Sequence, residues 1–478
     1  MKKLLWGIIS ILVLLSSIVA SSSRVYVKEH SDKFLEEDRI CSFPLPFFNN
    51  KLIPFPDIKP ALGERPLLLI LIEFSDVPHY PKHDIHYFDQ LLWGECPSVR
   101  DYYLEVSYGK FTFMKGGILG WYKSSCPLSG NEKSRDRIVR DAFRQAARDK
   151  SFNFAQYDKN KDGFLDTTEL SIIVCTSGIS SKHPMGAYHN WRLWDSRKIE
   201  TWDGVILDGE HSVVQEWHSW MVFAHELGHS LLLPDLYDYT RNSQGIGVYG
   251  LMGLGNLDGI NGHHFTAWSK IKLGWIEPTV ITKDGFYIVH DVETHPEAYI
   301  LKDPSHSDKE YFLVENRFRE SSYYDRTLPD EGIMIYHIDE SVPKWYTPWT
   351  WFPQVNNVEE HKMIDVECAD SFTSHFKDAD DLDKNINSGD DHDLWDSTTY
   401  GFNSTSVPCN SRWYDGTSNG IGVYVLSKPG RNMTVYFSIN GSTPSKHRQK
   451  QTSNASPYYR QFEIKILKLE EGVIRGKY

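Results

Sequence analysis

One short segment of the chain has residue types and spacing typical of metal chemistry, His225-Glu226-Leu227-Gly228-His229. On a helix, residues four apart lie on one face, so both imidazoles can bind the same Zn²⁺ ion. The glutamate beside the first histidine then faces a water molecule on the metal, whose pKa zinc lowers toward neutrality. The segment predicts His225 and His229 as zinc ligands and Glu226 as the catalytic residue that takes the water proton.

The surroundings of the pentapeptide favour a bound cation. It lies in an apolar stretch, Trp217–Leu233, that has helical periodicity. Two buried histidines and a glutamate need partners that offset their desolvation, and a metal ion supplies one. The alternative is a solvated polar stripe on a core helix.

Two features of the sequence reduce the number of candidates for the third zinc ligand: a missing glutamate and a predicted turn. No glutamate occurs between Glu226 and Glu277, which leaves the following candidates: Asp235, Asp238, Asp258, His263 and His264. Extended zinc motifs place their third ligand ten residues after the first histidine, beyond a sharp turn, and Asp235 follows Pro234 there. Met252, in a glycine-rich segment further on, predicts a methionine-containing turn beneath the metal. We therefore predict Asp235 as third ligand, with Asp238 as the nearest substitute.

A second motif predicts a Ca²⁺ site. Residues 158–169 match a twelve-residue calcium loop at its liganding positions, with the required glycine sixth; the predicted ligands are Asp158, Asn160, Asp162, Phe164 through its carbonyl, Asp166 and Glu169. A strand pattern, Leu170–Cys175, follows where a calcium sensor would have a helix. The loop therefore predicts a structural ion, and the alternative is a solvated acidic turn.

The elements around these motifs predict an α+β fold. An almost unbroken apolar run, Leu67–Phe74, predicts a buried strand, and the periodicity of Ser134–Arg148 predicts an amphipathic helix. From about residue 279 short strand patterns alternate with turns, which is typical of a β-rich unit; they are Tyr311–Val314, Ile333–His337, Met363–Val366, Ile421–Leu426 and Met433–Ile439.

The start of the chain and its cysteines predict export. A basic start and an apolar run, Leu4–Val19, are followed by small residues, as in a secretory signal peptide; an uncleaved anchor is the alternative. Six cysteines match no zinc-ribbon spacing and favour disulfides, for which proximity suggests Cys96–Cys126 and Cys368–Cys409. Alternatively, Cys41 could ligate zinc and keep the enzyme latent. Four glycosylation sequons occur at Asn403, Asn432, Asn440 and Asn454.

Charge and hydropathy exclude two classes of partner. The net charge of −13 argues against nucleic acid, because a phosphate-binding surface needs clustered Lys and Arg. No segment after residue 20 is apolar enough to span a bilayer, so stable membrane insertion is not expected.

Several segments in the same order resemble the immune inhibitor A family of metallopeptidases. They are Ser98–Lys110, the Asp158–Asp166 loop, His225–Asp238, Ala267–Trp275, Tyr311–Arg317 and Gly332–Asp339, and together they span about residues 65–440. The resemblance implies a zincin, metzincin-like catalytic domain followed by a β-rich domain, bound calcium and secreted endopeptidase activity. It implies His225, His229 and an aspartate matching Asp235 as ligands. One departure is Leu232, where the family usually has glycine and where a leucine resists the positive φ of a sharp turn.

Together these observations predict five regions and one function. The regions are a signal peptide (1–20), a pro-segment or N-terminal arm (21–62), a zinc peptidase domain with the calcium loop (63–278), a β-rich, sandwich-like domain (279–440) and a polar tail (441–478). The predicted function is a secreted zinc metalloendopeptidase that hydrolyses protein or peptide substrates. The alternative is an inactive, calcium-stabilised extracellular binding or adhesion protein, against which the intact Glu226 argues.

Overall fold

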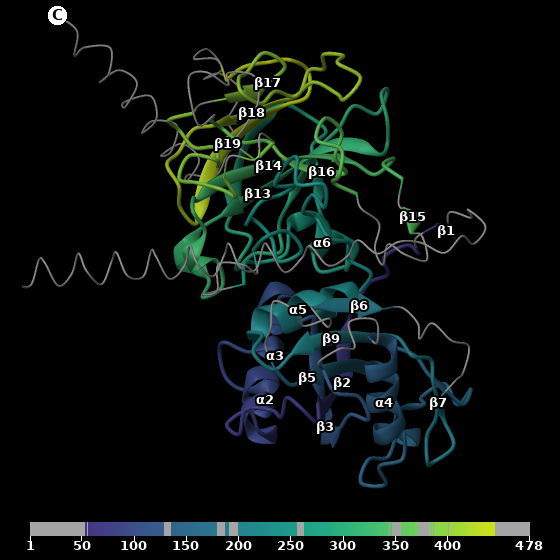
Figure 1. Cartoon of the computed structure of the whole chain (residues 1–478). Helices are drawn as coiled ribbons and strands as arrows, with labels where there is room; N and C mark the ends of the chain where they lie inside the picture. Colours follow the sequence, from purple (N-terminus) through teal and green to yellow (C-terminus); the bar gives the residue numbers. More distant parts are fainter. Residues whose placement is uncertain are drawn as a thin grey trace, which may run out of the picture. The chain divides into compact units, whose positions relative to one another are not determined.

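The computed structural model describes residues 53–54, 56–128, 135–178, 187–190, 199–255, 262–343, 345–346, 355–370, 382–383, 385, 387–399 and 401–444. The chain divides into two compact units, Met1–Gly441 and Ser442–Tyr478. The described part of the first unit is mixed α/β, strand-rich with few helices (Figure 1). The predicted signal peptide, Cys41 and most of the predicted arm lie outside the described residues, as does the tail after residue 444.

A five-stranded sheet carries the N-terminal half of the described chain, in the order β3-β2-β5-β9-β6. Its strands are β2 (Gly63–Glu73), β3 (Phe111–Lys123), β5 (Ser171–Thr176), β6 (Tyr188–Asn190) and β9 (His211–Gln215). The first four in the order are parallel, and β6 pairs with β9 in the antiparallel sense. The predicted strands at Leu67–Phe74 and Leu170–Cys175 are thus confirmed as β2 and β5, and both are buried because helices cover the two faces of the sheet.

The alternation of side chains along β2 explains the layers. Leu67, Leu69 and Leu71 lie in one core with α2 (Ile85–Trp93), α3 (Val99–Val106) and α5 (Trp220–His229). The intervening residues Leu68, Ile70 and Ile72 lie in a second core with α4 (Arg135–Ala147). Successive strand residues point to opposite faces, so this apolar run needs helices on both sides (Figure 1).

The apolar segment before the histidine motif is only partly helical. Residues 211–215 form β9 and pair with β5, and α5 begins at Trp220 and ends at His229. The prediction of a helix over Trp217–Leu233 was therefore too long at both ends. A turn at residues 216–217 separates β9 from α5, and a tight turn through Leu232 ends the helix.

The β-rich region consists of two packed sheets. One has five strands in the order β10-β12-β13-β14-β16 and the other four in the order β11-β19-β18-β17. The first contains β10 (Thr279–Val280), β12 (Tyr299–Leu301), β13 (Glu310–Arg317), β14 (Gly332–Asp339) and β16 (Ile364–Val366). The second contains β11 (Gly285–His290), β17 (Gly401–Asn403), β18 (Gly422–Val425) and β19 (Asn432–Ser438). All five strand patterns predicted after residue 279 coincide with strands of these sheets.

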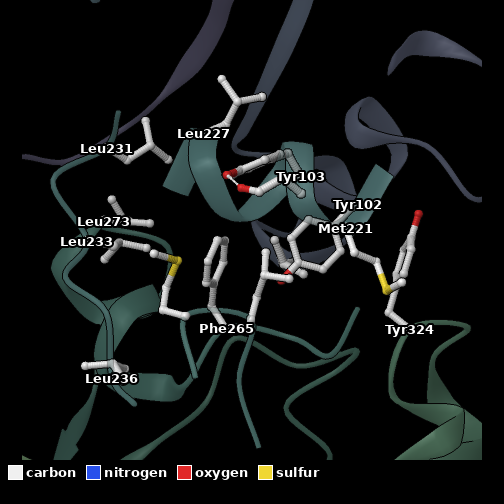
Figure 2. Close-up of a cluster of buried hydrophobic side chains, with 14 of the residues drawn as sticks. Tyr102, Tyr103, Met221, Leu227, Leu231, Leu233, Leu236, Phe265, Leu273 and Tyr324 are labelled. Carbon is white, nitrogen blue, oxygen red and sulfur yellow. Dashed lines mark hydrogen bonds between the residues drawn. The ribbon is translucent and has the colours of Figure 1, made fainter. Parts of the chain in front are cut away.

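The five-stranded sheet of this region contributes to two cores. Phe312 and Ile335 face the four-stranded sheet, in a core shared with Val423 and Val435. Alternate residues such as Leu313 and Tyr336 belong to the core that also contains α2, α3 and α5. Figure 2 shows part of that core, where Tyr102, Tyr103 and Phe265 pack beside Met221 and Leu227 of α5. The division at residue 278 stays a prediction, and apolar packing is continuous across it.

The remaining elements are short. They are β1 (Ile53–Pro54) paired with β15 (Trp345–Tyr346), a sheet of β4 (Phe164–Leu165), β8 (Ile206–Leu207) and β7 (Ile199–Glu200), the helix α6 (Ala267–Lys272), and the 3₁₀ turns η2 (Ala155–Tyr157), η3 (Arg319–Ser321) and η4 (Asp325–Thr327). No helix in the described ranges combines the length and the hydropathy needed to cross a membrane.

The predicted disulfides are wrong for the described cysteines. No disulfide joins Cys96 to Cys126, and none joins Cys368 to Cys409. Cys96 precedes α3, beside Asp101, whereas the residue before Cys126 bonds to Asp141 of α4. These two helices cover opposite faces of the sheet, so nearness in sequence does not bring the first pair together.

Candidate metal centre

Helix α5 carries both histidines of the motif on one buried face. All ten of its residues are buried, and the ring centroids of His225 and His229 are 4.9 Å apart. Both imidazoles point their Nε2 atoms at Asp235, whose Oδ1 atom lies 3.1 Å from Nε2 of His225 and 3.3 Å from Nε2 of His229. The structure thus brings together the three residues predicted as zinc ligands.

The turn after α5 determines how Asp235 reaches the histidines. The amide of Leu232 donates to the carbonyl of His229 (2.8 Å), and the amide of Leu233 donates to the carbonyl of Gly228 (3.2 Å). This pair of bonds is a Schellman motif, which places the residue at Leu232 in the left-handed region, where φ is 70°. The leucine therefore adopts the turn conformation that glycine adopts more easily, at a cost of about 1–2 kcal/mol.

Asp238 has a different role from Asp235. Its Oδ2 atom accepts the amides of Asn242 (3.0 Å) and Ser243 (2.9 Å), and its Oδ1 atom accepts that of Thr240 (2.7 Å). These bonds close the turn that follows the site. The geometry therefore favours Asp235 over Asp238 as the third ligand.

Backbone carbonyls fix the tautomer of both histidines. Nδ1 of His225 donates to the carbonyl of Leu251 (2.7 Å), and Nδ1 of His229 donates to that of Leu233 (2.8 Å). A carbonyl oxygen only accepts, so each Nδ1 carries a proton and each neutral ring keeps its Nε2 lone pair for a metal. The hydroxyl of Tyr239 bonds to Oδ2 of Asp235.

The electrostatics of the three residues suit a cation. Burial lowers the pKa of His225, but the hydrogen bond and charge of Asp235 outweigh this effect and raise it to about 9. Burial also opposes ionisation of Asp235, yet the two histidines hold the pKa of its carboxyl well below its usual range. The site therefore favours an ionised Asp235 carboxylate and a positive charge beside it. A divalent cation supplies that charge while leaving the imidazoles neutral.

The donor set fits zinc. Oδ1 of Asp235 is buried, and among the described residues its close polar neighbours are the Nε2 atoms of His225 and His229. The donor atoms of His225, His229 and Asp235 all lie within 4.8 Å of one another. Two nitrogens and one carboxylate oxygen, about 2.0–2.1 Å from a tetrahedral ion, would lie about 3.3 Å apart, close to the two observed nitrogen–oxygen separations.

A methionine packs against the helix between the two histidines. A Cβ atom added to Gly228 would lie 2.7 Å from Sδ of Met252, so the close approach requires a glycine here. The carbonyl of Met252 accepts the amide of Leu236 (2.7 Å), directly after Asp235. The segment Tyr249–Met252 therefore supports the site from below, as the predicted methionine turn would.

Glu226 lies beside the histidines with its side chain buried. Its charge contributes to the raised pKa of His225, which places the carboxylate near that ring. The backbone carbonyl of Glu226 accepts a hydrogen bond from the hydroxyl of Ser212 on β9 (3.1 Å). Ser212 in turn bonds to His189 on β6 (2.9 Å), whose ring centroid is 6.4 Å from that of His229.

His263 and His264, the two histidines that the sequence left as candidate ligands, bond elsewhere. His263 bonds to the carbonyl of Val248 (2.5 Å) and to Thr327 (3.2 Å). His264 bonds to Glu105, Ser322 and Lys270. Neither histidine belongs to the group formed by His225, His229 and Asp235. The remaining candidate, Asp258, lies outside the described residues.

The partners that complete the centre could not be found from a local pattern. They are the carbonyls of Leu233 and Leu251, the hydroxyl of Tyr239 and the hydroxyl of Ser212. Leu251 and Ser212 belong to segments outside the motif, and a backbone carbonyl leaves no signature in residue type.

The predicted calcium loop has the expected backbone conformation. Gly163 has a φ of 80°, and Asp158 accepts the amides of Asp162 (3.2 Å) and Gly163 (3.1 Å). Oε2 of Glu169 is buried and accepts no hydrogen bond from the described residues, and a strand, β5, follows the loop as predicted. Bound calcium stays a prediction. The one other group of three described residues whose donor atoms lie within 4.8 Å is the partly exposed set Asp370, Asp390 and His392.

Comparison with known proteins identifies distant homologues that are metalloproteases. The chain is 23% identical over 266 residues to the pre-pro-metalloprotease PrtV of Vibrio cholerae serotype O1 (strain M66-2), a match that covers 43% of this chain and 29% of that protein. It is 24% identical over 275 residues to immune inhibitor A of Bacillus thuringiensis subsp. alesti, covering 45% of this chain and 40% of that protein. The match thus spans less than half the length of these relatives. The chain matches no established family profile.

Proposed function

We propose that this protein is a secreted zinc-dependent metalloendopeptidase in which His225, His229 and Asp235 hold the metal and Glu226 is the catalytic residue. The observation that carries the proposal is that two Nε2 atoms of α5 and one carboxylate oxygen of Asp235, which follows the turn after α5, lie close together. The same helix carries Glu226. The distant metalloprotease homologues support the same reaction class. A zincin, metzincin-like catalytic fold and a structural calcium ion belong to this proposal.

The residues of the chain divide the chemistry between them. Zinc, when bound, supplies a Lewis acid that polarises a carbonyl and lowers the pKa of a water ligand. The carbonyls of Leu251 and Leu233 hold the Nδ1 proton of each imidazole, so that the Nε2 atom of each ring would face the metal. Glu226 takes a proton from the attacking water and returns it to the nitrogen of the leaving amine, so one carboxylate acts as base and then as acid.

The sheet edge beside the centre suits an extended substrate. In the described part of the chain, β6 is the outermost strand of its sheet, and it contacts α5. An extended polypeptide can pair with such an edge through its main chain, which binds many sequences without a demand on side chains. This arrangement supports protein or peptide substrates presented in an unfolded or flexible state.

The test separates catalysis from metal binding. We would express the secreted chain and the variants Glu226→Gln and Glu277→Gln, measure zinc content, and follow cleavage of a fluorescently labelled unfolded protein. The proposal expects all three to hold zinc, Glu226→Gln to lose about 10²–10⁴-fold in rate, and the exposed Glu277→Gln to match the parent. A chelator should abolish the parent activity.

Two outcomes would contradict the proposal in different ways. Equal turnover by Glu226→Gln would remove that residue from catalysis. Zinc-loaded parent protein with no turnover would instead favour the non-catalytic extracellular binding protein.

A further inference from the structure

The turn Tyr249–Met252 packs beside the proposed metal ligands. Residues of the β-rich region form hydrogen bonds with the backbone of this turn and with the side chain of Tyr249. Nη1 of Arg317, on β13, donates to the carbonyl of Tyr249 (3.4 Å). The hydroxyl of Tyr249 lies 2.6 Å from Oδ2 of Asp393 and 3.2 Å from the carbonyl of Asp390. Two residues further along, the carbonyl of Leu251 accepts a hydrogen bond from Nδ1 of His225.

The backbone anchor is held in place because acidic side chains surround Arg317. Its guanidinium is fully buried and lies 2.7 Å from Asp325, 3.2 Å from Glu315 and 3.3 Å from Glu293. These three partners hold the planar group in one orientation. In that orientation Nη1 donates to both Glu315 and the carbonyl of Tyr249.

The side-chain anchor is buried too. Tyr249 is 0% exposed and Asp393 is 1% exposed. The amide of Asp390 also donates to the Asp393 oxygen that contacts the tyrosine (2.7 Å). Burial raises the pKa of the Asp393 carboxyl to about 7, so the group depends on these two hydrogen bonds when it is ionised. The position of the tyrosine ring is therefore specified by residues about 140 positions away in the sequence.

We propose that Tyr249 is a positioning residue for the metal centre: clamped between Arg317 and Asp393, it holds the turn whose Leu251 carbonyl orients His225. The metal affinity of the N-terminal half then depends on contacts made by the β-rich region. This inference rests on the proposed function, because it assigns a supporting residue to the same zinc centre. Ligands supported in this way lose metal affinity when the support is removed.

The test uses two buried tyrosines that differ in one respect. Tyr249→Phe removes the hydroxyl that contacts Asp393. Tyr311→Phe removes the hydroxyl of another buried tyrosine, which donates to Glu340 (2.8 Å), a carboxylate outside the group that holds Arg317. Both variants lose one hydrogen bond to a carboxylate, so both should lower Tm by a similar amount, about 2 °C.

Zinc affinity of the full chain, measured by competition with a chromophoric chelator, distinguishes them. We expect Kd to rise about tenfold in Tyr249→Phe and to stay within about twofold of the parent in Tyr311→Phe. With Co²⁺ in place of Zn²⁺, the visible absorption of the bound ion should change in Tyr249→Phe alone. His225→Ala serves as the reference for loss of the site.

Each contrary result has one meaning. Equal zinc affinity in the parent and Tyr249→Phe, or an equal loss in both tyrosine variants, overturns the positioning role of Tyr249 and leaves the proposed function standing. Absence of His225-dependent zinc binding in the parent overturns the proposed function as well.

Discussion

Gly228 is a position where one added methyl group should disturb the candidate metal centre. In Gly228→Ala the new Cβ would lie 2.7 Å from Sδ of Met252 and 3.5 Å from an edge carbon of Phe265. Ordinary contacts between such atoms are about 3.5–4.0 Å, so the sulfur must move by about 1 Å. Overpacking of this kind costs about 1–3 kcal/mol, and the better helix propensity of alanine returns about 1 kcal/mol. We expect a net loss of about 1 kcal/mol in the free energy of unfolding.

The displacement should also weaken zinc binding, because Met252 and Leu251 are bonded to the segments that hold the ligands. Urea unfolding and a zinc titration measure the two effects on the same protein. The decisive comparison is a double-mutant cycle with Met252→Ala, which removes the obstructing sulfur. In that background Gly228→Ala should stabilise the protein by about 1 kcal/mol, the propensity gain alone.

A control defines what a glycine-to-alanine change does without a clash. A Cβ at Gly430 would meet nothing within 4 Å, so Gly430→Ala should leave stability unchanged or raise it slightly. The reasoning would be refuted if Gly228→Ala destabilised the chain equally with and without Met252.

The remaining predictions concern the tyrosine that contacts Asp235, the turn that ends α5 and a buried histidine of the β-rich region. Tyr239→Phe removes the hydroxyl bonded to Asp235 and should weaken zinc affinity about 10-fold or more, as measured by chelator competition. At Leu232, glycine should be tolerated within about 1 kcal/mol, whereas valine should destabilise by about 1–2 kcal/mol in urea unfolding, since a β-branched residue resists the φ of 70°. Burial lowers the pKa of His337, but hydrogen bonds to Glu310 and Glu367 raise it to about 9. Its stabilisation, on the order of 3 kcal/mol, is therefore complete below about pH 6.5 and lost as pH rises through 9. Between about pH 6.5 and 9, the free energy of unfolding should fall less steeply with pH in His337→Gln than in the parent. An unchanged slope would contradict the raised pKa of His337.

Local sequence patterns determined the parts of this protein whose geometry is set within a few residues. The four-residue spacing of His225 and His229 places both rings on one helix face whatever surrounds the helix. The unbroken apolar run of β2 requires helices on both faces of its sheet, and the structure has α2, α3 and α5 on one face and α4 on the other. The strand after Glu169 was likewise readable from its β-branched residues.

Only the tertiary structure shows which of the candidate residues lie close together. Sequence left Asp235 and Asp238 as alternatives, and the choice depends on a turn that Leu232 adopts at positive φ, against its local preference. The helix α5 is shorter than the predicted stretch because a turn at residues 216–217 precedes it and the turn through Leu232 follows it. The Cys96–Cys126 pairing was wrong because α3 and α4, near which these two cysteines lie, cover opposite faces of the sheet that contains β2.

The sequence by itself therefore determined the candidate metal ligands on α5 and much of the secondary structure around them, because both follow from short-range spacing. Only the tertiary structure decided how that chemistry is held. The carbonyl that orients His225, the hydroxyl beside Asp235 and the clamp on Tyr249 come from distant segments. Contacts between distant segments depend on the packing of the whole core, which no local pattern of residue types records.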